Sequence, residues 1–125
     1  MIVGIGTDII DVNRIHRVIE RNGAFVTKVF TPLEITYCNA KAAKAQSYAA
    51  RFAAKEATMK ALGTGWAMGI SWQDIEVENN AEGKPVLRLS GAALARAGEL
   101  GANLWHLSLS HEKDSALAFV ILENA

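Results

Sequence analysis

The sequence predicts a single α+β domain in which helices pack on a largely antiparallel sheet. Its 125 residues are an ordinary length for one domain, and half of them are hydrophobic, which excludes a disordered chain. Apolar runs rich in β-branched residues predict strands near both ends of the chain. Segments with helical periodicity lie between these runs, and turn residues join the later strands in pairs. We therefore expect residues 1–125 to form one domain.

A strand and a helix are predicted at the start of the chain. Residues 2–10 are apolar and β-branched apart from two glycines, a threonine and Asp8, as expected of a buried strand. Asp11 can cap a helix over residues 12–22. We expect that helix to end at Gly23, because glycine favours the backbone conformation that closes a helix.

Two more helices are predicted in the first half. The segment from Thr31 to Glu34 combines a capping box with a proline at the first helical position, which predicts that a helix begins there. A longer helix is predicted over residues 44–62, and Gly63 ends it.

The second half is predicted to be richer in strands. Residues 74–89 have the pattern of a β-hairpin, with turn residues from Asn79 to Gly83. Ser90 can cap a helix over residues 91–100, closed by Gly101.

The last two predicted strands cover residues 103–110 and 115–123, with a polar turn from His111 to Asp114. Both are apolar at nearly every position. We therefore expect both to be covered on two faces.

Composition excludes several classes of protein. The 13 basic and 13 acidic residues cancel, which argues against a general nucleic-acid binder. The first residues lack a basic leader, and the charge-free stretch 61–73 is too short to span a membrane. The single cysteine, Cys38, fits a reducing compartment and a buried apolar role. We expect a cytoplasmic protein without a membrane or nucleic-acid partner.

The helix predicted over residues 44–62 holds the first candidate site residues. Glu56 and Lys60 share a helical stripe with apolar residues, where core side chains are expected. The ordinary alternative is a solvated Glu–Lys pair one turn apart. A buried carboxylate and ammonium are costly unless they are compensated. A divalent cation beside Glu56 and a phosphate beside Lys60 would compensate them. The apolar members of the stripe are Ala45, Ala49 and Phe52.

Asp8 is a second candidate, because it is an acid in an apolar strand beside glycines that allow close approach. It could instead cap the following helix, but Asp11 already fills that position. Two carboxylates from different elements are a usual way to hold Mg²⁺ on a phosphate substrate.

Three further groups could contact phosphate. Lys44, Arg51 and Lys55 form a basic stripe that flanks Glu56, either as a solvated face or as a polyphosphate site. The turn at Gly63 and Thr64 follows a helix end that repels anions, although exposed amides there could bind phosphate as a nest. His111 could donate to phosphate or be an ordinary turn histidine.

Five ordered blocks, which span essentially the whole chain, resemble bacterial holo-acyl-carrier-protein synthases, a family of phosphopantetheinyl transferases. The blocks are GIGTDI around Asp8, RFAAKEATMKALGTG (51–65), GISWQDIEV (69–77), GKPVLRLSG (83–91) and LSLSH (107–111).

The resemblance implies the phosphopantetheinyl transferase fold, usually as a homotrimer with active sites between subunits. It implies transfer of 4′-phosphopantetheine from coenzyme A to a serine of apo acyl carrier protein, for fatty acid synthesis, with release of 3′,5′-ADP. Asp8 and Glu56 would bind Mg²⁺, Lys60 would contact the phosphates, and His111 would approach the 3′-phosphate end of coenzyme A. The general base stays open between Glu56, a metal-bound water and another carboxylate.

The resemblance also gives a meaning to the charge distribution. Residues 1–60 carry nine basic and five acidic residues, whereas residues 61–125 carry four and eight. Arg14, Arg17 and Arg21 share one face of a predicted helix, which could dock an acidic carrier protein or be merely solvated. A rival hypothesis is a non-catalytic module that binds a nucleotide phosphate or an acidic protein.

Overall fold

The computed structural model describes residues 1–65 and 68–125, and its elements form one α+β domain. In chain order they are β1 (Ile2–Asp11), α1 (Val12–Arg21), α2 (Gly23–Val29), α3 (Pro32–Asn39), α4 (Lys44–Leu62), the 3₁₀ turn η1 (Trp72–Asp74), β2 (Ile75–Asn79), β3 (Pro85–Leu89), α5 (Gly91–Glu99), β4 (Leu104–Glu112) and β5 (Ser115–Glu123).

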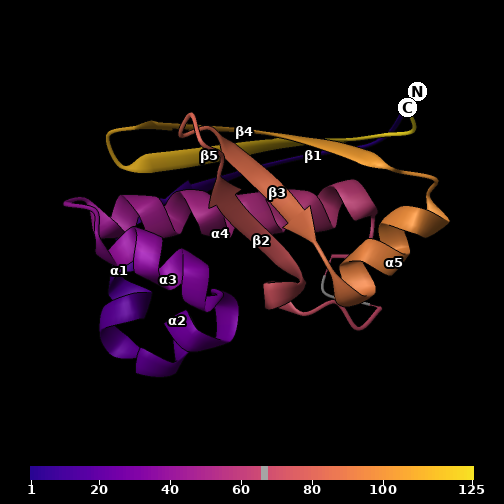
Figure 1. Cartoon of the computed structure of the whole chain (residues 1–125). Helices are drawn as coiled ribbons and strands as arrows, with labels where there is room; N and C mark the ends of the chain where they lie inside the picture. Colours follow the sequence, from indigo (N-terminus) through magenta and orange to yellow (C-terminus); the bar gives the residue numbers. More distant parts are fainter. Residues whose placement is uncertain (66–67) are drawn as a thin grey trace.

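Helix α4 lies at the centre of the domain. An antiparallel sheet in the order β1-β5-β4 covers one side of it, and the β2–β3 hairpin crosses its other side (Figure 1). Helices α1 to α3 gather near its N-terminal end, whereas α5 lies near its C-terminal end (Figure 1). The predicted fold class is confirmed. No helix among the described residues has the length and apolarity needed to cross a membrane.

Glycines allow α4 to lie unusually close to β1. A Cβ atom added to Gly6 would lie 1.8 Å from the carbonyl oxygen of Ala57, and one added to Gly4 would lie 2.4 Å from that of Ala61. Neither distance is physically possible for a real side chain without movement of the backbone. The group that approaches the glycines of the first strand is therefore the backbone of α4.

The opposite face of the β1-β5-β4 sheet is open in the single chain. Burial alternates along β4 and β5, and the exposed positions of β1 and β5 carry large apolar side chains. The prediction that the last two strands are covered on two faces is therefore wrong for this chain alone, because α4 covers only one face. The exposed side chains are Ile5, Ile9, Leu117 and Phe119.

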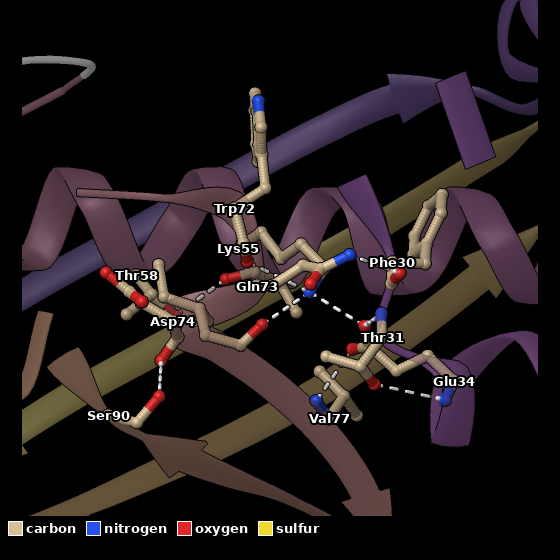
Figure 2. A network of polar contacts seen from close by, with 12 residues as sticks. Phe30, Thr31, Glu34, Lys55, Thr58, Trp72, Gln73, Asp74, Val77 and Ser90 are labelled. Carbon is tan, nitrogen blue, oxygen red and sulfur yellow. Dashed lines mark hydrogen bonds and ion pairs between the residues drawn. The ribbon is translucent and has the colours of Figure 1, made fainter. Parts of the chain in front are cut away.

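A buried ion pair joins α3, α4 and the β2 segment. Lys55 and Glu34 both have fully buried side chains, and their charged atoms lie 2.8 Å apart. The Lys55 ammonium also donates to the carbonyl oxygens of Trp72 and Ile75 (Figure 2). The Glu34 carboxylate accepts from the backbone amides of Thr31 and Val77 at 2.9 and 2.8 Å. Every charge in this pair is thus compensated, which a buried ion pair requires.

Most predicted caps are confirmed. Asp11 accepts a hydrogen bond from the amide of Asn13, and the capping box of Thr31 and Glu34 is complete at the start of α3. Gly63 closes α4 with a φ of 73°, in the left-handed region. Cys38 is buried, and burial raises the pKa of its thiol to about 11, so it is an inert core residue.

Three local predictions are wrong. Gly23 does not close α1, because Asn22 accepts from the amide of Ala24 and starts a new helix, α2. Asp74 lies in the 3₁₀ turn before β2 rather than in the strand. The side chain of Ser90 does not cap α5 but makes a long contact with the carbonyl oxygen of Asp74 (Figure 2).

We predict that Gly6→Ala destabilises the fold by about 1–3 kcal/mol or more, because the new methyl group must separate β1 from α4. Gly23→Ala is the matched control, since nothing lies within 4 Å of the Cβ position there. Urea unfolding of both variants measures the difference. Equal midpoints for the two variants would show that the close approach is not required.

Candidate functional site

Asp8, Lys60 and Glu56 lie together where β1 crosses α4. The inner face of β1 carries Gly4, Gly6 and then Asp8, so the acid follows directly after the contact with α4. The Lys60 ammonium lies 3.0 Å from a carboxylate oxygen of Asp8 and donates to the carbonyl oxygen of Thr7. Asp8 is 16% exposed and Lys60 53% exposed, so both reach solvent.

The pKa of Glu56 depends on its burial and on the charges around it. Partial burial raises the pKa of its carboxyl group, and the Asp8 carboxylate raises it further. The positive charges of Lys60 and Arg14 oppose this shift without cancelling it. Among the described residues no ion pair neutralises Glu56. Two acids from different elements therefore repel one another at a surface that ligands can reach.

The structure corrects the expected burial of this stripe. Glu56 is only half-buried and Lys60 is exposed, because β1 packs against Ala57 and Ala61 of α4 and leaves the side chain of Lys60 beside the strand. Lys60 pairs with Asp8 rather than with Glu56 one turn away. The alternative of a simple Glu–Lys pair on α4 is therefore wrong, and Asp8 has a partner in the site rather than a role as a cap.

The donor set fits Mg²⁺ bound together with phosphate. The described residues contain no group of three or more His, Cys, Asp or Glu side chains that could form a metal cage. Mg²⁺ usually takes only one or two protein carboxylates and completes its shell with water and substrate phosphate. Asp8 and Glu56 offer that number, and a cation between them would relieve their repulsion.

The basic stripe of α4 is not a solvent-exposed face. Lys55 is fully buried in its pair with Glu34. Arg51 is 4% exposed, donates to the side-chain oxygen of Asn79 at 2.8 Å and lies 4.0 Å from the ring centroid of Tyr37. The alternative of a solvated face is wrong for these two residues, because β2 and α3 cover that side of α4. The pair of Lys55 and Glu34 escaped sequence reasoning because the capping box already accounted for Glu34.

Lys44 is exposed at the start of α4, at the other end of the helix from Lys60. It lines a cavity of about 470 Å³ with residues of α1 and with Tyr48. The structure does not bring it to the cluster of Asp8, Glu56 and Lys60. The assignments of Lys44 and Arg51 to a coenzyme site stay predictions.

The turn after α4 uses its own amides. The Gly63 amide donates to the carbonyl oxygen of Lys60, and the Thr64 amide donates to that of Met59. This pattern satisfies the free carbonyl groups at the end of α4. These two amides are therefore not available as a phosphate nest, and the hydroxyl group of Thr64 donates to the carbonyl oxygen of Gly65 at 3.2 Å.

His111 is the penultimate residue of β4 rather than part of the turn, which contains only Lys113 and Asp114. The register pairs His111 with Ala116, and Ala116 with Ile10. His111 is thus separated from β1 by a whole strand and does not contact Asp8. It is exposed beside a cavity of about 550 Å³ at the hairpin end.

Arg14, Arg17 and Arg21 are all exposed along α1, as predicted for one helix face. Arg14 lies near enough to Glu56 to lower the pKa of its carboxyl group. The arginine face therefore begins beside the carboxylate site.

Comparison with known proteins identifies the family of this chain. Residues 4–120 match the model of the 4′-phosphopantetheinyl transferase superfamily. The chain belongs to that superfamily.

Individual relatives and solved structures narrow the family assignment. A holo-[acyl-carrier-protein] synthase of Solibacter usitatus is 53% identical, over 99% of this chain and all of the relative. The crystal structure of the holo-[acyl-carrier-protein] synthase of Neisseria meningitidis aligns with a TM-score of 0.89 at 40% identity, over 98% of this chain and 99% of that one. The crystal structure of a synthase from Bacillus anthracis, in complex with CoA (3′,5′-ADP), aligns with a TM-score of 0.82 at 39% identity. The alignment covers 100% of this chain and 99% of that one. The chain is a member of the holo-[acyl-carrier-protein] synthase family.

We predict that the Glu56 carboxyl group, followed by carbon-detected NMR titration, ionises at a higher pH than an ordinary glutamate. Asp8→Asn should move the midpoint to lower pH, because it removes a like charge. Added Mg²⁺ should shift the wild-type midpoint in the same direction, since a cation favours the ionised acid. A midpoint that neither change moves would show that the two carboxylates do not share a site.

Proposed function

We propose that this protein transfers 4′-phosphopantetheine from coenzyme A to a serine of apo acyl carrier protein. The serine hydroxyl gives its proton to a general base and its oxygen forms a bond to the β-phosphorus of coenzyme A. The bond from that phosphorus to the bridging oxygen breaks, and 3′,5′-ADP leaves. The observation that carries the proposal is the cluster of Asp8, Glu56 and Lys60 in a member of this family. The cluster supplies two acids for a cation and one mobile ammonium, which are the parts that phosphoryl transfer needs.

The two acids of the cluster and its lysine have different proposed tasks. Asp8 and Glu56 would hold Mg²⁺, which neutralises the charge that develops on the phosphates. Lys60 is held beside Asp8 but remains half exposed, so its ammonium can turn toward an incoming phosphate. The hydrogen bond from Lys60 to the Thr7 carbonyl group keeps the ammonium at the site in the absence of substrate. Catalysis then rests on positioning and charge neutralisation.

The rest of the coenzyme is proposed to contact Gly63, Thr64, His111, Lys44 and Arg51. Gly63 and Thr64 follow Lys60 within one helical turn. His111 and Lys44 lie away from the Asp8 cluster in the single chain, so they would serve a site shared between two copies. Arg51 would act there through a guanidinium group that Asn79 and Tyr37 hold in place.

The proposed assembly is a homotrimer with sites between subunits. The open face of the β1-β5-β4 sheet supports it, because Ile5, Ile9, Leu117 and Phe119 would otherwise remain in water. We predict sedimentation at three times the chain mass of 13.5 kDa. A monomer at micromolar concentration would contradict the proposal. The expected compartment is the cytoplasm, where the single buried thiol needs no partner.

The proposed protein partner is an acidic carrier that docks on α1. We predict that Arg14→Ala combined with Arg21→Ala raises the KM for the carrier several-fold and leaves the affinity for coenzyme A unchanged. The rise should shrink at high salt, because exposed charges act over a screened distance. Arg88→Ala is the control, since Arg88 is an exposed arginine on β3 that pairs with Glu78. Equal KM values for all three proteins would contradict docking on α1.

The direct test mixes the protein with coenzyme A, Mg²⁺ and an apo carrier, and intact mass spectrometry detects the added phosphopantetheine arm. Glu56→Gln should reduce the rate by about 100-fold or more, because it removes a charged ligand from the site. Its fold should persist, since the wild-type carboxylate is destabilised by burial and by Asp8. An unmodified carrier, beside a known synthase that works in parallel, would reject the proposal in favour of a non-catalytic binding module. Such a module would also need no Mg²⁺.

A further inference from the structure

The C-terminal end of α4 presents an electrostatic problem for a phosphate ligand. The helix dipole is negative there, and the last carbonyl groups point outward. Lys60 is the one basic residue in the last turn. The amides of Gly63 and Thr64 already donate hydrogen bonds to carbonyl groups in the last turn of α4. A phosphate group near this turn therefore needs a positive charge from another element.

Arg96 supplies such a charge from α5. Its Nε atom donates to the carbonyl oxygen of Leu62 at 3.0 Å, so it satisfies one of the free groups at the end of α4. Its Nη1 atom lies 3.3 Å from a carboxylate oxygen of Glu99. The side chain is 26% exposed, which leaves part of the guanidinium in contact with solvent.

The third nitrogen of Arg96 faces the turn. Nη2 lies 3.8 Å from the position that a Cβ atom on Gly63 would occupy, and no other described atom outside Gly63 and its two chain neighbours lies within 4 Å of that position. Nη2 has no hydrogen bond to the described residues. The glycine thus leaves a space above the turn, and an uncommitted guanidinium nitrogen borders it. Arginine suits this position because its remaining donors can bind phosphate while Nε holds the helix end.

We propose that Arg96 is a phosphate-binding residue of the coenzyme A site, which contacts a phosphate group through Nη2 over Gly63. This inference rests on the proposed function. Lys60 and Arg96 then serve the same end of α4, Lys60 from the side of β1 and Arg96 from α5. Arg96 also offsets the negative end of the helix where the phosphate arrives.

The test measures the affinity for coenzyme A and for 3′,5′-ADP by isothermal titration calorimetry. Arg96→Gln should weaken both by about 10-fold or more, as expected for loss of a charge-assisted hydrogen bond. Arg96→Lys should bind with intermediate affinity, because it keeps the charge but loses the fork geometry. Arg88→Gln is the matched control and should bind as the wild type does.

Glu99→Gln separates binding from a purely structural role. It removes the carboxylate that competes for the guanidinium, so the affinity for both ligands should rise or hold while Arg96→Gln lowers it. If Arg96→Gln lowers the melting temperature and leaves both affinities unchanged, Arg96 only caps α4 and the inference fails. If the wild-type protein still transfers phosphopantetheine when Arg96→Gln leaves both affinities unchanged, the proposed function is retained and only the inference on Arg96 fails. Wild-type protein that neither binds coenzyme A nor transfers the arm refutes both.

Discussion

The contact between β1 and α4 is the constraint on which the site depends. Two glycines of β1 let the backbone of the strand lie against the backbone of the helix, at a separation that no other residue permits. Asp8 comes next along the same face of the strand, and Lys60 lies in the last turn of the helix beside Ala61, which contacts the strand. The 3.0 Å contact between their side chains therefore follows from backbone packing. Even a small shift of α4 would separate the acid of the strand from the groups of the helix.

The other side of α4 is held by a different kind of interaction. The Lys55 ammonium is bound to Glu34 and to the carbonyl groups of Trp72 in η1 and Ile75 at the start of β2, in a buried position (Figure 2). Such a pair contributes less to net stability than to the choice of one arrangement, because a rotated helix would leave both charges buried and unpaired. Lys55 precedes Glu56 directly. The rotation of α4 that buries Lys55 thus turns Glu56 toward Asp8 of β1.

The arginine face of α1 and the C-terminal end of α4 differ in their charge. The arginine face of α1 begins near Glu56, so the proposed docking face and the carboxylate site lie at one edge of the molecule. The C-terminal end of α4 is instead a place of negative potential, and Arg96 from α5 counters it. The apolar face of the sheet lies on the side of β1 and β5 away from α4, which leaves it free for another copy of the chain.

Local signals in the sequence determined much of the fold. Caps such as Asp11, Thr31 and Gly63 mark helix ends through short-range hydrogen bonds, so they can be recognised from neighbouring residues. Helix α2 was not predicted, because Asn22 and Gly23 suit the start of one helix as well as the end of another. Asp8, Glu56 and Lys60 could be named as candidates because acids and a lysine at apolar positions are unusual. No pattern in the sequence indicates the distances between these three side chains.

Only the tertiary structure decided which charged residues face solvent. Lys55 and Lys60 are both lysines of α4, yet the first is fully buried and the second is half exposed. The difference arises because β2 and α3, distant in the chain, cover the side of the helix that holds Lys55, whereas β1 packs against Ala57 and Ala61 and leaves Lys60 beside the strand. Arg96 acquires its place beside Gly63 in the same way, through the packing of α5 against α4. Residue type and periodicity are properties of a segment, and burial is a property of what packs against it.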